Sequence, residues 1–226
     1  QVLRDLKGTS HLLGIRDCSV QRNYQKLIEE SAFDLPQKIQ DQLFKYSRKL
    51  IDEIDYVGAG TVEFIYDLGE QKIYFMEMNT RLQVEHPVSE MVTGVDLVNQ
   101  QFSVAEGNSL ENLKIRTHGH AMELRINAER VDLDSSGFLR FVPDPGRVTE
   151  AYFPAEENIR VIKAVTNGSM VPPFYDSLVA QIIAWGEDRK EAIELLLDYL
   201  SRVKIHGIST NLVLAKRILQ DQDFQV

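Results

Sequence analysis

The sequence of 226 residues predicts an α+β fold with a mainly antiparallel sheet. Two β-rich runs, 61–67 and 73–79, flank a short stretch with a central glycine, a pattern typical of an antiparallel hairpin. Residues 178–185 form a nearly continuous apolar run, which indicates a strand buried on both faces. Residues 36–54 and 189–203 carry apolar side chains at helical spacing and predict two amphipathic helices.

The first part of the chain, 1–117, is expected to form one domain. It opens with a predicted strand over 10–18, followed by the helix over 36–54. Pro36 lies at the start of that helix, where the missing N–H has no helical partner in any case. The hairpin comes next, and a further helix is expected over about 94–106.

The second part, 118–226, is expected to form another domain and to pack with the first as one unit. In addition to the elements above, we expect a strand over 119–127 and a closing helix over 210–219. Between them, residues 132–146 are rich in Asp, Ser, Gly and Pro and predict a long loop. Ser209 or Thr210 is the expected cap of the closing helix.

The composition is that of an ordinary globular protein, with 43% hydrophobic and 26% charged residues. A formal net charge of −9 argues against a broad surface for nucleic acid or an anionic membrane. No run approaches the roughly 18 apolar residues of a membrane span. The single cysteine, Cys18, excludes an internal disulfide and a Cys-rich zinc site, and its apolar flanks predict a small buried residue rather than a nucleophile.

Residues 77–87 combine acid, amide and guanidinium groups at the end of a predicted strand. Glu77 and Asn79 are two positions apart, so their side chains leave the same face of the sheet. Arg81 and Glu85 follow in a segment that ends at Pro87, where a regular strand or helix is not expected to continue. This set of groups suits a site that holds a metal, an anion and a proton acceptor.

The hairpin adds a second acid to this set. If its turn is centred near Gly69, Glu63 lies opposite Glu77, with the two Cβ atoms roughly 5 Å apart. Like charges at that distance repel, so a divalent cation or a shared proton is expected to offset them. Two carboxylates and an amide suit Mg²⁺ held against substrate phosphates. The alternative is that both glutamates point into water.

Several blocks of the sequence are similar to those of a known protein family. Residues 76–88, MEMNTRLQVEHPV, resemble the signature of the biotin carboxylases, the ATP-grasp components of acetyl-CoA, propionyl-CoA and pyruvate carboxylases. Four further blocks agree in order and spacing, namely RDCSVQR, GAGTVEF, ELRINAE and PPFYDS at 16–22, 58–64, 123–129 and 172–177. The resemblance therefore runs along nearly the whole chain.

The resemblance implies the end of an ATP-grasp domain over 1–117 and a biotin carboxylase C-terminal domain over 118–226. The implied activity is the carboxylation of biotin with ATP and bicarbonate, through carboxyphosphate, with Mg²⁺ or Mn²⁺ as the metal. Biotin would arrive as a substrate on a biotin carboxyl carrier domain, and the implied partners are a carboxyltransferase and a second copy in a homodimer. The cytoplasm, or the mitochondrial matrix in a eukaryote, is the expected location. The family's N-terminal domain and Gly-rich lid are missing, so we expect a fragment that is inactive alone.

The resemblance also assigns roles to individual residues. The implied metal ligands are Glu63, Glu77 and Asn79. Bicarbonate would bind to Arg81, Lys26, Gln83 and Val84, the last two through the backbone, and Glu85 would take its proton. The implied nucleotide ligands are Gln21, Tyr24 and Glu77. Arg125 would bind biotin and stabilise the negative oxygen that develops on it.

Several of these positions have a simpler interpretation. Lys26 taken alone is a solvated lysine, and Arg125, which lies beside Glu123 in its strand, could form a cross-strand ion pair of little energetic consequence. Many family members have histidine where this chain has Tyr24, so the contact with the nucleotide sugar is expected to differ. His86 is interpreted as a structural imidazole, and Asp176 is a candidate to orient Arg125.

Two other functions remain open at this stage. One is another ATP-grasp ligase, such as a carbamoyl phosphate synthetase or a purine-pathway carboxylase, which would keep an acidic metal-binding hairpin. The block around Arg125 argues against it. The other is a non-catalytic dimerisation or assembly module of a larger carboxylase.

Overall fold

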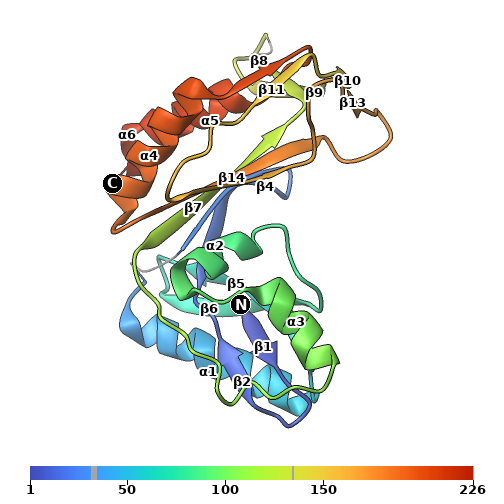
Figure 1. Cartoon of the computed structure of the whole chain (residues 1–226). Coiled ribbons are helices and arrows are strands. Elements are labelled where there is room, and N and C mark those ends of the chain that lie inside the picture. Colours follow the sequence, from blue (N-terminus) through green and yellow to red (C-terminus); the bar gives the residue numbers. More distant parts are fainter. Residues whose placement is uncertain (32–34, 134, 226) are drawn as a thin grey trace. The chain divides into compact units, whose positions relative to one another are not determined.

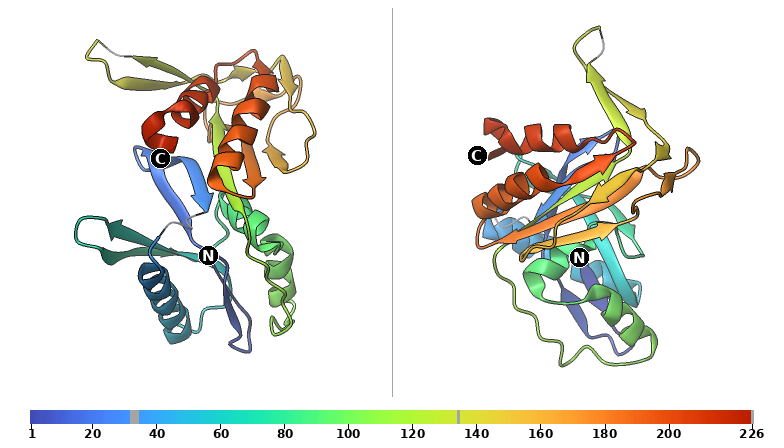
Figure 2. Two further views of the ribbon diagram at one scale, coloured as in Figure 1. Left: turned by 90° about the vertical axis from the view of Figure 1, so that its left-hand side faces the viewer. Right: turned by 45° about the horizontal axis from the view of Figure 1, so that its top comes forward.

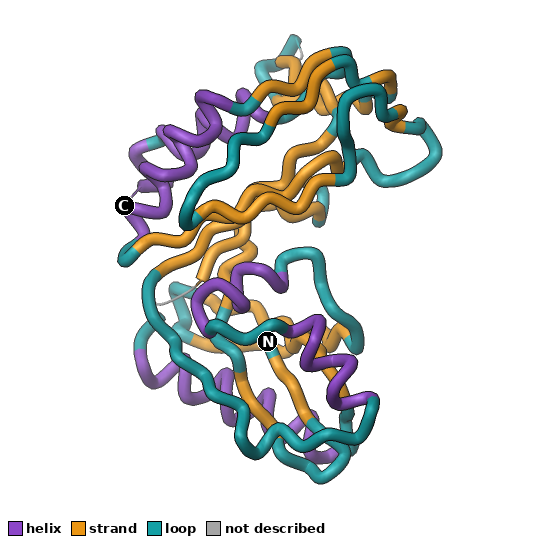
Figure 3. Tube along the Cα trace, viewed as in Figure 1, coloured by secondary structure: helices purple, strands orange, loops and turns teal. Residues whose placement is uncertain are grey.

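The computed structural model describes residues 1–31, 35–133 and 135–225, and these residues form two compact units. Unit 1 comprises Gln1–Asp17 and Ser31–His118, and unit 2 comprises Cys18–Glu30 and Gly119–Val226. Figure 1 labels the elements, and Figure 3 separates helices from strands. The predicted α+β class is confirmed, and the described strand pairs are antiparallel.

Unit 1 is built on a four-stranded sheet in the order β2-β1-β5-β6. The strands are β1 (Val2–Arg4), β2 (Ser10–Leu12), β5 (Gly58–Asp67) and β6 (Lys72–Asn79). Helix α1 (Gln37–Glu53) buries Ile39, Leu43, Ser47 and Ile51, which recur every fourth residue. Helices α2 (His86–Thr93) and α3 (Leu97–Ala105) follow the hairpin. The predicted hairpin and the predicted helix over 36–54 are confirmed.

Unit 2 is built on a five-stranded sheet in the order β12-β14-β7-β4-β3. Its strands are β3 (Arg16–Arg22), β4 (Gln25–Ser31), β7 (His120–Asn127), β12 (Ile159–Lys163) and β14 (Leu178–Gly186). Helix α4 (Arg189–Arg202) packs on β14 and β7, with Leu196 and Leu200 fully buried. Helices α5 (Leu212–Gln220) and α6 (Gln222–Gln225) complete the helical part. The predicted strands over 119–127 and 178–185 and the predicted helix over 189–203 are confirmed.

Three two-stranded ribbons extend unit 2. They are β8 (Glu129–Leu133) with β9 (Leu139–Pro143), β10 (Gly146–Arg147) with β13 (Met170–Val171), and β11 (Glu150–Tyr152) with β15 (Lys204–His206). Figure 2 shows the β8–β9 hairpin as an arm that projects from the sheet of unit 2. The predicted long loop over 132–146 is therefore wrong, because most of it pairs with itself or with neighbouring strands; residue 134 lies outside the described residues.

Three other expectations about local structure are corrected. The predicted strand over 10–18 divides into β2 and β3, separated at Gly14, which has a φ of +81°. The predicted helix over about 94–106 is confirmed as α3, and Gly94, in the left-handed conformation, ends the preceding helix α2. Pro87 does not end a segment: it lies in the first turn of α2, where proline is tolerated. The residue at the cap position of α5 is Asn211 rather than Ser209 or Thr210.

Most of β3 and β4 belongs to unit 2, although both strands lie between segments of unit 1 in the sequence, because β4 pairs with β7 in the sheet of unit 2. The β4 residue Glu30 contacts His120 and Arg189, and we call these three residues the Glu30 cluster. Glu30 Oε2 lies 2.8 Å from His120 Nε2 and 2.7 Å from Arg189 Nε. Burial raises the pKa of Glu30, but the hydrogen bonds and charges of its two neighbours outweigh burial and hold it below its usual value.

No described helix is long and apolar enough to cross a membrane.

Candidate functional site

The β5–β6 hairpin brings two acidic side chains together in unit 1. Glu63 and Glu77 are direct partners in the strand register, next to a bulge between Glu63 and Phe64. The side-chain nitrogen of Asn79 donates to Glu63 Oε1 at 3.1 Å and to Glu77 Oε1 at 2.9 Å. These two oxygens share one donor and are therefore at most about 6 Å apart. The register predicted from the sequence is present.

The loop after β6 folds back onto this acidic pair. Gln83 is buried, and its Nε2 donates to Glu63 Oε1 at 2.6 Å. Arg81 is exposed and contacts Asn79 Oδ1 through its Nη2 at 3.3 Å. Hydrogen bonds therefore link five of the predicted site residues of unit 1 into one chain.

The remaining predicted residues of this loop lie at the start of α2. Glu85 is 2% exposed and occupies the position before the helix, whereas Val84 is exposed. His86 Nδ1 lies 2.8 Å from the carbonyl oxygen of Gln83, and its Nε2 lies 4.0 Å from Glu90 Oε1. His86 thus contacts the backbone of the loop that carries the candidate anion ligands.

The donor set can be tested for its fit to Mg²⁺. Among the described residues there is no group of three or more His, Cys, Asp or Glu side chains suited to a metal. Two carboxylates and an amide still fit Mg²⁺, which keeps waters and takes substrate phosphates as its other ligands. The amide of Asn79 turns its nitrogen toward both glutamates, so it must rotate before its oxygen can reach a cation between them.

Arg125, on β7 of unit 2, forms a cross-strand ion pair, and its partner is Glu29 of β4. Its Nε donates to Glu29 Oε1 at 2.6 Å, and Glu29 is fully buried. Asp176, the candidate from the sequence, instead accepts a hydrogen bond from the backbone N–H of Leu178 at 2.8 Å. Glu29 was missed because its contact depends on the pairing of β4 with β7, where it lies opposite Glu123 and diagonal to Arg125.

The β3–β4 turn carries the predicted nucleotide ligands. Asn23 and Tyr24 both have positive φ, as in the two-residue turns that match the twist of a hairpin. Tyr24 is 98% exposed, and Gln21 is exposed and donates to the carbonyl of Cys18 at 2.6 Å. Lys26, the first residue after Gln25 on β4, is half-buried. The prediction of a buried Cys18 is wrong, because this side chain is half-buried.

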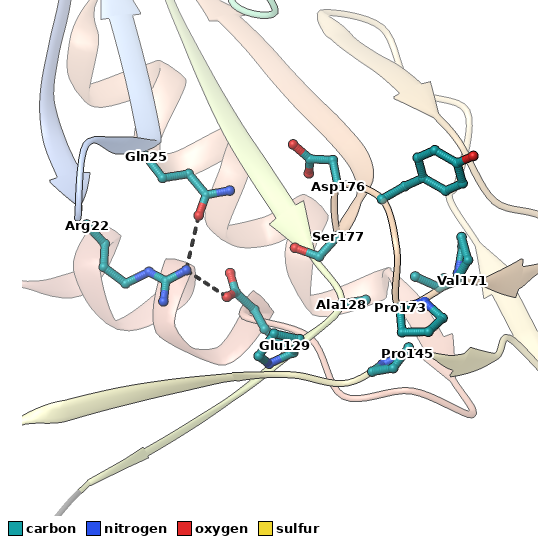
Figure 4. A pocket seen from close by; sticks show the side chains of 12 residues that line it. Arg22, Gln25, Ala128, Glu129, Pro145, Val171, Pro173, Asp176 and Ser177 are labelled. Carbon is teal, nitrogen blue, oxygen red and sulfur yellow. Dashed lines mark hydrogen bonds and ion pairs between the residues drawn. The ribbon is translucent and has the colours of Figure 1, made fainter.

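A pocket of about 320 Å³ lies beside this turn in unit 2 (Figure 4). Its lining includes Arg22, Gln25, Glu129 and a group of prolines from the β9–β10 and β13–β14 connections. Arg22 Nη2 donates to both Gln25 Oε1 and Glu129 Oε2 at 3.0 Å. None of the predicted catalytic or metal-binding residues lines this pocket. The pocket is therefore a separate feature from the β5–β6 hairpin with Glu63 and Glu77, which we call the acidic hairpin.

Two protein-family models match consecutive parts of the chain. Residues 1–113 match the carbamoyl-phosphate synthase L chain, ATP binding domain, and residues 123–226 match the biotin carboxylase C-terminal domain. The chain belongs to the biotin carboxylase family.

Relatives and solved structures agree with this assignment. The chain is 44% identical to biotin carboxylase 1 of Bacillus subtilis (strain 168), with 99% of this chain and 49% of the relative covered. A biotin carboxylase from Campylobacter jejuni, in a β-γ-ATP complex, has a TM-score of 0.91 at 41% identity over 99% of this chain and 49% of its own. The biotin carboxylase domain dimer of the Hydrogenobacter thermophilus 2-oxoglutarate carboxylase, with MgADP, ADP and bicarbonate, has a TM-score of 0.91 at 40% identity over the same shares. The chain thus spans about half the length of these proteins.

Proposed function

We propose that this chain is the carboxyl-terminal half of a longer biotin carboxylase, called here the intact enzyme. The intact enzyme uses ATP and bicarbonate to carboxylate biotin on a carrier domain, and a carboxyltransferase then uses the product. Residues 1–117 form the end of its ATP-grasp domain and residues 118–226 its C-terminal domain, with residues 18–30 adding two strands to the second sheet. We place the intact enzyme in the cytoplasm as a homodimer.

The observation that carries the proposal is the hydrogen-bonded chain on the acidic hairpin. Asn79 joins Glu63 to Glu77, and Gln83 ties the following loop to Glu63. Glu63, Glu77 and Asn79 would hold Mg²⁺ or Mn²⁺. When bound, that ion supplies positive charge against the phosphate oxygens during phosphoryl transfer.

The side chains of the loop provide the chemistry of the first step. The guanidinium of Arg81, the ammonium of Lys26 and the backbone N–H groups near Gln83 and Val84 hold bicarbonate, a planar anion that matches a guanidinium fork. Glu85 accepts the proton of bicarbonate while a bicarbonate oxygen attacks the γ-phosphorus of ATP. The bond to ADP breaks, and carboxyphosphate forms. Gln21, Tyr24 and Glu77 contact the nucleotide.

The second step uses Arg125. Carboxyphosphate breaks down into CO₂ and phosphate, and the phosphate takes the N–H proton of the ureido group of biotin. Negative charge develops on the ureido oxygen, and the ureido nitrogen attacks CO₂ to form the new N–C bond. The guanidinium of Arg125 stabilises that oxygen by a charge-assisted hydrogen bond. The contact with Glu29 keeps the Nε side of the guanidinium occupied and leaves its direction fixed.

The test separates the two steps in the intact enzyme. Arg81→Ala is expected to abolish bicarbonate-dependent ATP cleavage, because the anion is no longer held. Arg125→Ala is expected to spare that partial reaction and to suppress biotin carboxylation. Glu63→Gln and Glu77→Gln are expected to weaken the dependence on Mg²⁺ or Mn²⁺ and to lower turnover by orders of magnitude. If the rate of ATP cleavage depends on neither bicarbonate nor free biotin, the proposal is overturned and another ATP-grasp ligase is favoured.

A further inference from the structure

Arg16 occupies the centre of a hydrogen-bond network in unit 1 that the proposed mechanism does not use. Its Nη1 donates to Gln1 Oε1 at 2.8 Å and to Ser89 Oγ at 2.7 Å. Its Nη2 donates to Thr61 Oγ1 at 3.0 Å and to Gln83 Oε1 at 3.1 Å. One guanidinium therefore ties together the start of β1, strand β5, the loop after β6 and helix α2.

The contact with Gln83 fixes which way its amide points. A guanidinium can only donate hydrogen bonds, so the group that faces Arg16 has to be the amide oxygen. The amide nitrogen then faces the acidic hairpin, where it donates to Glu63 Oε1 at 2.6 Å. Gln83 is 6% exposed, so water has little access to replace either bond.

We propose that Arg16 is a positioning residue for the metal site, acting through Gln83 on the Glu63 carboxylate. This inference rests on the proposed function, which makes Glu63 a metal ligand. The arginine sets the orientation of the amide, and the amide holds one carboxylate oxygen while the ligand set forms. The same amide belongs to the residue whose backbone is proposed to bind bicarbonate, so Arg16 also fixes that segment.

Loss of Arg16 has a definite electrostatic consequence. Without the guanidinium, the Gln83 amide is free to turn its oxygen toward Glu63, which places two acceptors side by side. Groups that orient a metal ligand in this way typically change metal affinity by about 10–100-fold when they are removed. We therefore expect Arg16→Met to weaken Mn²⁺ binding by about tenfold or more.

Unit 1 offers a matched control for the loss of a buried arginine. Arg4 has a side chain that is 11% exposed, and it contacts Asp52, Asp55 and the carbonyl of Tyr56. These three partners all precede β5 in the sequence and lie outside the acidic hairpin. Arg4→Met is expected to lower the free energy of unfolding while leaving Mn²⁺ affinity within about twofold of the wild type, because its partners lie elsewhere.

The experiment measures Mn²⁺ affinity by electron paramagnetic resonance on the intact enzyme, without turnover, together with the melting temperature of each variant. The variants are Arg16→Met, Gln83→Met, the double variant and Arg4→Met. If Arg16 acts through Gln83, the two single substitutions and the double one each weaken Mn²⁺ binding by about the same factor, because the second change removes nothing further. Effects that multiply in the double variant would overturn the inference, as would an equal loss in Arg4→Met.

The variants Gln83→Met and Glu63→Gln separate the possible outcomes. Gln83→Met leaves Arg16 in place, so it still tests the path if Arg16→Met does not fold, and wild-type Mn²⁺ affinity in Gln83→Met rules the path out. Glu63→Gln reports on the metal site itself. Unchanged Mn²⁺ affinity in Glu63→Gln would contradict the proposed function, whereas loss there with no loss in Arg16→Met contradicts only the role of Arg16.

Discussion

The ion pair of Arg22 with Glu129 gives a prediction about the stability of unit 2. Glu129 has a side chain that is 3% exposed, and Arg22, which is 24% exposed, lies 3.0 Å from it. The guanidinium also lies 4.0 Å from the ring centroid of Phe141 on the β8–β9 arm. Arg22→Met removes the cation and leaves a buried carboxylate with no counter-charge.

The size of the effect follows from these contacts. At 3.0 Å and an effective dielectric constant of about 20, the gross attraction is roughly 5 kcal/mol, but desolvation of both charges offsets most of it. The variant instead measures the cost of an uncompensated buried charge, about 3–5 kcal/mol. The lost contact with Phe141 adds about 0.5–1 kcal/mol. Partial exposure of Arg22 lets water reach the carboxylate, so we expect a total of about 3 kcal/mol.

The matched variant is Glu129→Gln, which keeps an acceptor for Arg22 but removes the buried charge. We expect it to cost about 1 kcal/mol, clearly less than Arg22→Met. The assay is urea unfolding followed by the fluorescence of Trp185, the single tryptophan of the chain, which lies on β14 and reports on unit 2. The double variant Arg22→Met/Glu129→Met should recover stability relative to Arg22→Met. Equal losses in the two single variants, or no recovery in the double one, would refute the reasoning.

Three other predictions concern other parts of the molecule. Glu30→Gln should lower the free energy of unfolding of unit 2 by about 2 kcal/mol at pH 7. Because the native pKa of Glu30 is depressed, the wild type should exceed the variant in stability by the full amount above the usual carboxyl range, and this difference should disappear as the pH falls through the native pKa. The measurement is the melting temperature of both proteins as a function of pH. Gly119→Ala should destabilise more than Gly94→Ala, since both have a φ of +70° but only the first would place a Cβ 2.5 Å from the ring of Trp185; equal shifts in the urea midpoint would contradict this. The 226-residue chain alone should show bicarbonate-dependent ATPase at least about tenfold below the intact enzyme, because no Gly-rich phosphate loop is present to position ATP, and each 1.4 kcal/mol or so of lost positioning is a factor of ten.

The acidic hairpin could be predicted because its geometry is local. The register of Glu63 against Glu77 depends only on the turn between two adjacent strands, so the strand period and the turn length are enough to place it. The helix α1 was predictable for the same reason, since its buried residues repeat within one segment. Its apolar spacing required no knowledge of what it packs against.

The features that escaped prediction depend on distant parts of the chain. Strand β4 pairs with β7, more than ninety positions away, and this pairing alone places Glu29 beside Arg125. The β8–β9 hairpin carries Asp, Ser and Gly, residue types that also fill ordinary loops, so its turn chemistry concealed its strands. The role of Arg16 could not be predicted, because its four acceptors come from four separate segments of the chain.

The division of the chain into two units bears on how the reaction is arranged. The proposed metal ligands and Arg81 belong to unit 1, whereas Lys26, the nucleotide candidates of the β3–β4 turn and Arg125 belong to unit 2. The chain passes from unit 1 into unit 2 at residue 18 and returns at residue 31, so β3 and β4 are held by the second sheet although they lie among unit 1 residues in the sequence. In the proposed reaction, Arg81 of unit 1 binds bicarbonate before phosphorylation, whereas Arg125 of unit 2 acts on the biotin oxygen after carboxyphosphate has formed. Because the two arginines act in successive steps, their substitutions are expected to affect different partial reactions.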